Sequence, residues 1–276
     1  MSEHLLAIDA LNVVRRCYEA NPEPDSDRKA QGALHVSTLV VRRAVREHEP
    51  THVVIAMDPV GDNWRHALYP AYQAARMPMP EPLRHALREN PGWMSWVRNL
   101  GALGWEEPGF EADDLLGSLS AFWTRAKPQA RMTILSTDKD TCSLVSDRVQ
   151  VVDHFNHVVR DAAWVQAKFG VGVHQVLDYL ALMGDAVDGI PGVARVGTKS
   201  AARLLGQYGT LEGVLAAAHE IPGALGKSVR ENVEMARLSR RLTALRLDVP
   251  LPQALQRRIG CAAQNSSAPT AREGVP

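Results

Sequence analysis

Short apolar runs alternate with longer helical patterns through the first part of the chain. The runs have the aliphatic and β-branched density of parallel strands that are covered on both faces. They span Leu5–Ile8, His52–Met57, Ala102–Trp105, Met132–Leu135 and Val149–Val152. Between them, apolar residues recur at helical spacing in Leu34–Val45 and Leu115–Ala126. The alternation predicts an α/β fold with a mostly parallel central sheet flanked by helices.

From about residue 172 onward the strand pattern stops and only helical patterns remain. One covers residues 174–183 (HQVLDYLALM), and Thr198–Tyr208 is a second, with Thr198 as the expected N-cap. Ser228 and Glu231 (S-V-R-E) predict a capping box for a helix that runs to about Leu245. We therefore expect an α/β core over residues 1–171, a helical region over 172–258 and a small, polar, disordered tail over 259–276.

Composition excludes some classes of protein. Cys17, Cys142 and Cys261 are scattered and form no CxxC pair, which argues against a thiolate metal site or a disulfide framework and favours a reducing, cytoplasmic setting. No apolar run is long enough to span a bilayer, and the N-terminus lacks the pattern of a signal peptide, so no membrane association is expected. With nothing in the sequence to indicate an oligomer, a monomer is the default.

Charge is balanced over the whole chain but not along it. Lys and Arg number 31, as do Asp and Glu, so the net charge neither favours nor excludes nucleic acid. From Ile190 to Arg246, however, nine Lys and Arg stand against four Glu. That excess suits either a nucleic-acid surface or an ordinary solvated face.

Acidic residues follow the predicted strands. Asp9, Asp58, and the pair Asp138 and Asp140 come directly or shortly after three of the apolar runs. Each aspartate alone is typical of a turn or an N-cap. Because the carboxyl ends of parallel strands share one edge, which is where ligands bind in open α/β folds, all four are expected to converge.

Two further acidic groups are expected at the same edge. FEADDLLGSL, residues 110–119, begins a helix with Glu111, Asp113 and Asp114, and MGDAVDG adds Asp185 and Asp188 after a helix. A helix start tolerates acids, but nine clustered carboxylates would repel one another unless cations were present. Carboxylate oxygens without His or Cys favour Mg²⁺ or Mn²⁺ over zinc. So many acids predict two ions, an arrangement that suits in-line attack on a phosphodiester.

The stretch GVARVGTKS, residues 192–200, resembles a nucleotide-binding phosphate loop but fails by one residue, because Thr198 separates Gly197 from Lys199. No apolar strand leads into it, so no nucleotide triphosphate is expected. A glycine-containing turn followed by a helix N-terminus can instead grip a nucleic-acid phosphate. An ordinary capped helix connection explains the glycines equally well, and both interpretations stay open here.

Several motifs together resemble one family. DGIPGVARVGTKSAARLL is similar to the helix–hairpin–helix segment (H3TH motif) of the 5′ nucleases: flap endonucleases, phage 5′ exonucleases and the 5′-nuclease domain of bacterial DNA polymerase I. The anchors AIDALN, IAMD, WRHALYPAYQAARMPMPEPL, FEADDLLGSL, LSTDKD and MGDAVDGIPG follow in the family's order between about Leu5 and Leu215. With no polymerase domain following, the resemblance implies a stand-alone bacterial member.

The resemblance implies a structure-selective, Mg²⁺-dependent nuclease that cuts DNA near single-strand/double-strand junctions in replication or repair. It implies two metal ions, for which Mn²⁺ can substitute. The first metal cluster would comprise Asp9, Asp58, Glu111, Asp113 and Asp114. The second would comprise Asp138, Asp140, Asp185 and Asp188.

Other roles also follow from the resemblance alone. Residues 61–98 would form an arch over the site, in which Tyr72 could stack on an unpaired base. Three arginines would orient the scissile phosphate or stabilise its charge: Arg16, Arg65 and Arg76. The hairpin would contact duplex DNA through Gly192, Val193, Arg195, Gly197, Thr198, Lys199 and Arg203. It would also hold K⁺ through the backbone carbonyls of Val193 and Val196.

One position departs from the family pattern. Gln73 stands where relatives usually carry lysine after the tyrosine, which implies weaker turnover. The departure leaves open an alternative function, a DNA-structure-binding protein of the same fold with weak or no nuclease activity. The complete set of acids argues against that alternative. A related PIN-type ribonuclease is a further alternative, against which the helix–hairpin–helix stretch argues.

Overall fold

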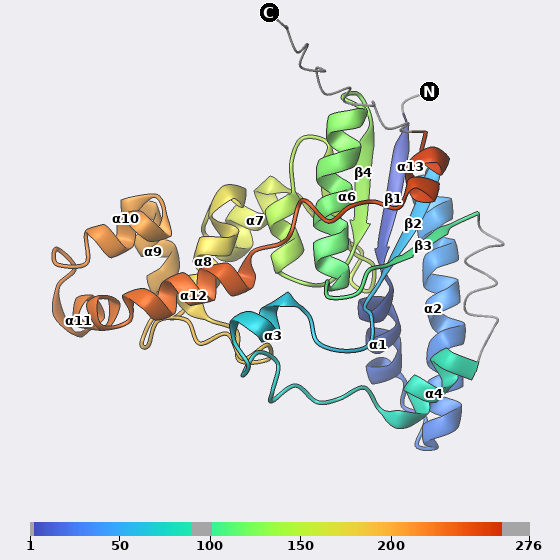
Figure 1. Cartoon of the computed structure of the whole chain (residues 1–276), viewed down its shortest axis with the longest axis horizontal. Coiled ribbons are helices and arrows are strands. Elements are labelled where there is room, and N and C mark those ends of the chain that lie inside the picture. Colours follow the sequence, from blue (N-terminus) through green and yellow to red (C-terminus); the bar gives the residue numbers. More distant parts are fainter. Residues whose placement is uncertain (1–2, 90–100, 261–276) are drawn as a thin grey trace, which may run out of the picture.

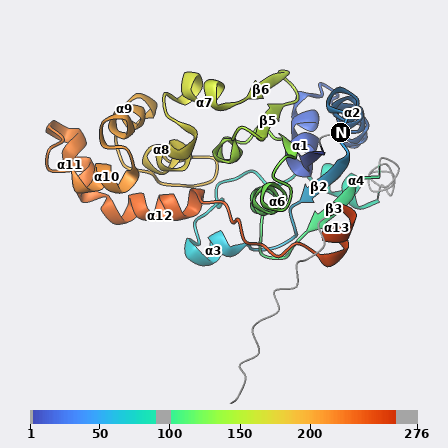
Figure 2. The same ribbon diagram turned by 90° about the horizontal axis from the view of Figure 1, so that it is seen from above.

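The computed structural model describes residues 3–89 and 101–260. Their core is a six-stranded sheet in the order β3-β2-β1-β4-β5-β6 (Figures 1 and 2). The strands are β1 His4–Asp9, β2 His52–Met57, β3 Leu103–Glu106, β4 Arg131–Leu135, β5 Val149–Asp153 and β6 Val158–Arg160. The first five run parallel and β6 pairs antiparallel with β5. The predicted α/β fold and its five strands are confirmed, while β6 is too short for its pattern to be recognised.

Both faces of the sheet are covered, because alternate residues of each strand point to opposite sides. In β1, Leu6 and Ile8 pack in the core that contains α1 (Ala10–Ala20), α2 (Ser26–His48) and α4 (Glu81–Glu89). Leu5 and Ala7 pack on the opposite face, against α6 (Ala112–Ala126). Residues buried on both faces explain the continuous apolar runs in the sequence.

A second core lies in the helical region (Figure 1, yellow to orange). Its elements are α7 Ala162–Phe169, the 3-10 turn η2 Val173–Gln175, α8 Val176–Met183, α9 Thr198–Tyr208, α10 Leu211–Ala216, α11 Gly223–Glu231 and α12 Val233–Thr243. Two local predictions are wrong. Gly197, not Thr198, is the N-cap of α9. Ser228 lies inside α11 and donates to the Ala194 carbonyl, so the predicted S-V-R-E capping box does not exist.

After α12 the chain returns to the α/β core. Residues 244–259 cross α6 and end in α13 (Gln253–Arg258), as the red segment in Figure 1 shows. Val249, Leu251, Leu255 and Ile259 are buried in the core on the α6 side of the sheet. The predicted tail therefore starts too early at residue 259, because Ile259 has 0% exposure. Residues 261–276 lie outside the described part.

The predicted arch, residues 61–98, is described only up to residue 89. It contains α3 (Trp64–Leu68), a connection through residues 69–80 and α4. Leu83 and Ala86 of α4 are buried in the same core as α2. Within the described ranges, no helix is both long and apolar enough to cross a membrane.

Candidate active site

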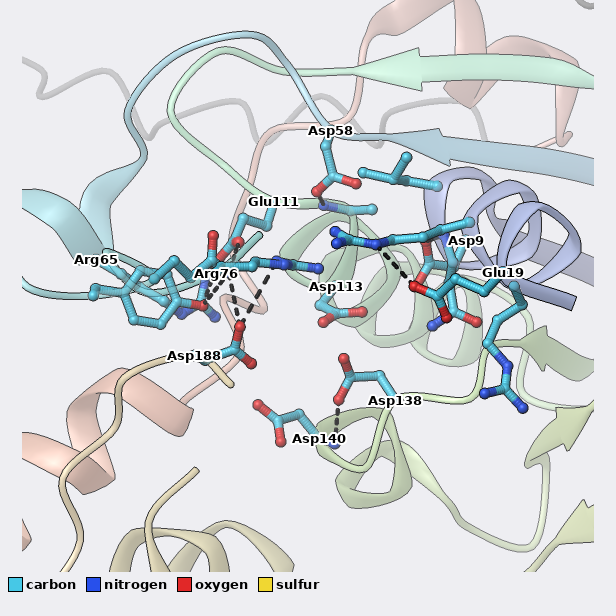
Figure 3. A pocket seen from close by; sticks show the side chains of 17 residues that line it. Asp9, Glu19, Asp58, Arg65, Arg76, Glu111, Asp113, Asp138, Asp140 and Asp188 are labelled. Atoms are coloured by element: carbon cyan, nitrogen blue, oxygen red, sulfur yellow. Dashed lines mark hydrogen bonds and ion pairs between the residues drawn. The ribbon is translucent and has the colours of Figure 1, made fainter. Parts of the chain in front are cut away.

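The carboxyl ends of the parallel strands open into a cavity lined by acidic side chains (Figure 3). Its volume is about 120 Å³, well below the ~300–1,000 Å³ of pockets that hold whole small molecules. Seven of the nine predicted acids line it: Asp9, Asp58, Glu111, Asp113, Asp138, Asp140 and Asp188. They come from the ends of β1 and β2, the start of α6, the loop after β4 and the loop after α8. The sheet topology thus gathers carboxylates from distant parts of the chain.

Asp9 and Asp58 are held where their strands end. Asp9 caps α1: its Oδ1 accepts from the Asn12 backbone N–H at 3.0 Å, and its Oδ2 accepts from the Ser136 hydroxyl at 3.1 Å. Asp58 Oδ1 accepts from the backbone N–H of Ala112, the first residue of α6, at 2.9 Å. Burial, with the nearby Asp58 carboxylate, raises the pKa of Asp9 to about 8, and burial also raises the pKa of Asp58. The negative charge of both groups is therefore unfavourable until a cation lies beside them.

Asp113 faces the cavity with an oxygen that lacks a partner. Among the described residues, none donates a hydrogen bond to its buried Oδ1. Burial, together with the carboxylates of Asp138 and Asp9, raises the pKa of Asp113 well above its ordinary value. Burying a carboxylate oxygen without a hydrogen-bond partner costs free energy, so Asp113 is well placed to bind a cation.

The neighbouring Asp114 has a different environment. It has 0% exposure and does not line the cavity. Its Oδ2 accepts from Arg65 Nη1 at 2.8 Å and from Trp64 Nε1 at 2.9 Å, and its Oδ1 accepts from Arg65 Nη2 at 3.0 Å and from the Arg246 backbone N–H at 2.9 Å. With both oxygens occupied by donors, Asp114 anchors the fold and stands outside the cavity that the other four predicted members of the first metal cluster line.

The hydrogen-bond donors of Arg65 are all used as well. A guanidinium has five N–H donors, and here all are used: three go to Asp114 and Glu111, and two go to the carbonyls of Leu242 and Ala244 at 2.8 and 2.9 Å. Arg65 is 2% exposed. All of its donors are thus engaged by protein groups, whereas the predicted role needs one that reaches a phosphate. Instead it ties Glu111, at the cavity, to the segment that follows α12.

Tyr72 is also buried, at 5% exposure. Its hydroxyl donates to Glu111 Oε2 at 3.1 Å, and its ring lies in a small cluster with Ile190 and Leu242. Tyr72 lines the cavity, but at 5% exposure its ring offers little surface for the stacking that the sequence predicts. Its role is to hold Glu111, whose pKa is raised by burial.

The second predicted metal cluster also has members that line the cavity and one member that does not. Asp138 Oδ1 accepts from the Asp140 backbone N–H at 3.2 Å, at the start of the 3-10 turn η1 (Asp140–Leu144). Burial and the Asp138 carboxylate raise the pKa of Asp140 well above its ordinary value, and burial raises the pKa of Asp188. Asp185 does not line the cavity and pairs with Lys139 Nζ at 3.2 Å. The structure thus brings three of the four predicted members together.

All three predicted arginines line the cavity, and two of them, Arg76 and Arg16, are not buried. Arg76 lies 3.7 Å from Asp188 Oδ1 and extends between the acids in Figure 3. Arg16 lines the cavity and lies over the Phe155 ring, 5.4 Å from its centroid. Both arginines are exposed residues, in contrast to Arg65.

Sequence reasoning missed three residues at this site. Glu19 and Arg15 line the cavity from α1 and pair with each other at 3.3 Å. Asn12 Oδ1 accepts from the Thr137 backbone N–H and hydroxyl, both at 3.0 Å, and so fixes the loop after β4. The asparagine in AIDALN, three residues after the strand-end aspartate, was the available signal for this contact.

The hairpin before α9 lies in the helical region, apart from the cavity lining. Gly192, Val193 and Val196 are buried, and the Val193 carbonyl accepts from the Val196 N–H at 3.0 Å. The exposed predicted DNA-binding residues are Arg195, Gly197, Thr198, Lys199 and Arg203. Gly197 caps α9 without a side-chain hydrogen bond, which leaves N–H groups at the helix start for a ligand.

The donor set suits hard divalent cations. Eight acidic residues line the cavity against four arginines, and one of those arginines, Arg65, has all its donors bonded to Glu111, Asp114 and two backbone carbonyls. Among the described residues, no group of three or more Asp, Glu, His or Cys side chains is placed so that it could hold a metal ion by itself. Mg²⁺ suits so open an arrangement, because it keeps several waters and needs only one or two carboxylates plus substrate phosphates. The cavity lies at the carboxyl ends of the strands, where open α/β sheets bind their ligands.

Comparison with known proteins identifies the family. The family model "5′-3′ exonuclease, N-terminal resolvase-like domain" matches residues 4–170, and "5′-3′ exonuclease, C-terminal SAM fold" matches residues 171–266. The chain therefore belongs to the 5′-3′ exonuclease family.

Relatives and solved structures agree with this. A protein of Pectobacterium carotovorum named flap endonuclease Xni is 38% identical over 93% of this chain and 94% of its own, and one of Vibrio cholerae is 36% identical over 93% and 96%. Phage T5 5′-exonuclease with bound zinc superposes with a TM-score of 0.72 at 17% identity, covering 88% of this chain and 90% of that one. A T5 flap endonuclease pseudo-enzyme–product complex with DNA and metal ions gives 0.72 at 16% identity, with the same coverage. At these identities the structures show a shared fold.

Proposed function

We propose that this chain is a structure-selective 5′ nuclease that hydrolyses DNA phosphodiesters near single-strand/double-strand junctions. The observation that carries the proposal is the convergence of seven carboxylates on one cavity at the carboxyl edge of the sheet. Relatives named flap endonuclease and the T5 complex with DNA and metal ions support it. We place its work in DNA replication or repair.

Two Mg²⁺ ions, replaceable by Mn²⁺, are the proposed cofactors. The first would be held among Asp9, Asp58, Glu111 and Asp113, and the second among Asp138, Asp140 and Asp188, with Asp185 at its margin. When bound, such ions activate a water for attack and neutralise the charge that develops on the phosphate. The partnerless Asp113 Oδ1 and the raised pKa values of Asp9 and Asp140 support this assignment.

Arg76 and Arg16 are proposed to contact the scissile phosphate. Both line the cavity, and neither is buried in an ion pair as Arg65 is. Their charge would stabilise the phosphate where its negative charge grows in the transition state. Glu111 is kept in place for metal binding by Arg65 and Tyr72, which act as positioning residues.

The hairpin and the start of α9 are the proposed duplex-binding surface. Free N–H groups at a helix N-terminus and the exposed Lys199 and Arg203 suit backbone phosphates, which carry no sequence information. A K⁺ ion held by the carbonyls of Val193 and Val196 is part of the same proposal. We further propose an arch over the cavity from residues 61–98, and a cytoplasmic, monomeric protein whose two main regions meet near residue 171.

The test is incubation with 5′-flap DNA, blunt duplex DNA and single-stranded RNA, each with Mg²⁺ or with EDTA. We expect Mg²⁺-dependent cleavage of the flap substrate near its junction. Asp113→Asn should abolish cleavage while DNA binding persists, and the exposed Asp147→Asn serves as a matched control. Junction binding without metal-dependent cleavage would favour the alternative, a DNA-structure-binding protein. Cleavage of RNA alone would indicate a PIN-type ribonuclease.

A further inference from the structure

One side-chain amide joins the two groups of acids. Gln73 Nε2 lies 3.0 Å from Glu111 Oε1, in the first group, and 3.1 Å from Asp188 Oδ1, in the second. The backbone N–H of Gln73 also donates to the Asp188 carbonyl at 2.9 Å. Gln73 therefore contacts Asp188 through both its main chain and its side chain.

The backbone at Gln73 is unusual. Its φ of 54° is left-handed, a conformation that residues other than glycine adopt rarely. The other non-glycine residues with positive φ in the described ranges are Glu49, His157 and Arg195, and none of them lines the cavity. A glycine would adopt this turn more easily, but it could make neither amide contact.

The loop that carries Asp188 is built to approach this turn closely. Gly189 has φ 67°, and a Cβ at that position would lie 2.9 Å from the Ala71 carbonyl oxygen. Only glycine therefore permits the two segments to lie this near each other. The close approach and the backbone hydrogen bond place the Gln73 side chain between Glu111 and Asp188.

We propose that Gln73 is a positioning residue that fixes the separation of the two metal-binding groups. This inference rests on the proposed function, because it assigns those carboxylates to metal ions. The amide nitrogen lies within hydrogen-bond distance of both carboxylates and, at 3.2 Å, of the Tyr72 hydroxyl, and the amide carries no charge. Gln73 thus orients both carboxylates without adding a further positive charge to those that Arg65 brings to Glu111 and Arg76 brings to Asp188.

The decisive variant is Gln73→Gly. It removes the amide while relaxing the left-handed backbone, so any loss comes from the side chain and not from strain. Partners that orient metal ligands are typically worth about 10–100-fold in metal affinity or activity. Calorimetric titration of the full chain with Mn²⁺ and with Mg²⁺, without DNA, should show affinity weakened by about that factor. Gln73→Met, similar in size but without donors, should show the same loss.

The matched control is His157→Gly, a second left-handed residue, which lies outside the cavity lining. Its metal affinity should equal that of the wild type. Unchanged affinity in both Gln73 variants, or an equal loss in His157→Gly, would overturn the proposal. Failure of the wild type to cleave flap DNA while it binds metal would instead count against the proposed function and leave the role of Gln73 intact.

Discussion

Asp113 and Asp114 are adjacent and chemically identical, yet the structure predicts opposite effects when each becomes asparagine. Asp113 faces the cavity with an unpaired oxygen among other carboxylates. Asp114 is fully buried and accepts from Arg65, Trp64 and the Arg246 backbone. Removing charge should relieve repulsion at the first site and break a buried ion pair at the second.

The magnitudes follow from these environments. In Asp114→Asn an amide NH₂ must point at an N–H donor whichever way it is turned, and Arg65 keeps only Glu111 as a charged partner. Breaking one side of a buried pair costs about 3–5 kcal/mol. At about 2–4 °C per kcal/mol for a larger domain, the Tm should fall by about 6–20 °C. In Asp113→Asn, measured without metal, the free energy of unfolding should be unchanged or about 1 kcal/mol higher.

The assay is thermal and urea unfolding in EDTA, followed by circular dichroism, with cleavage of flap DNA measured at 20 °C on the same preparations. Asp113→Asn should stay folded and lose cleavage. Asp114→Asn should lose stability but keep cleavage in proportion to its folded fraction. A double-mutant cycle with Arg65→Gln should give a coupling of about 0.5–3 kcal/mol. Equal Tm shifts in the two asparagine variants, or no shift in Asp114→Asn, would refute this account of the network.

Four further outcomes are expected. Because burial raises the pKa of Asp9 to about 8 from its usual 3.8, the folded state holds a proton that the unfolded state releases, so metal-free stability should fall as pH rises between those values. Tm values in EDTA at pH 5, 7 and 9 check this, and a rising Tm would contradict it. Arg76→Ala should lower kcat for flap cleavage about 10²–10³-fold, while the exposed Arg28→Ala should not; equal rates would exclude the phosphate role. Lys199→Ala should weaken binding to duplexes of any sequence and reduce the slope of log affinity against log salt by about 1, as fluorescence anisotropy can measure. Gln73→Lys should raise the cleavage rate, because a lysine there can still bond Glu111 and Asp188 and adds a positive charge for the scissile phosphate; an unchanged or lower rate would count against that.

Local patterns in the sequence determined where the strands lie and therefore where their terminal acids meet. The apolar runs gave five parallel strands, and Asp9, Asp58 and Asp138 converge because parallel strands end on one edge. The helical second half was equally readable, because its apolar spacing is local. Helix boundaries were harder to predict. The predicted S-V-R-E capping box is absent because the Ser228 hydroxyl bonds a distant group, the Ala194 carbonyl.

Tertiary structure alone decided what each acidic or basic residue does. Successive helix positions point about 100° apart, so Asp113 and Asp114 reach different surroundings although their sequence context is the same. Arg65 is buried and bonded to the Leu242 carbonyl because the chain returns 177 residues later to pack against it. No spacing or local pattern encodes a partner so distant. It is set by how the segment after α12 packs back across α6, which also divides the acids between those that face the cavity and those that hold the fold together.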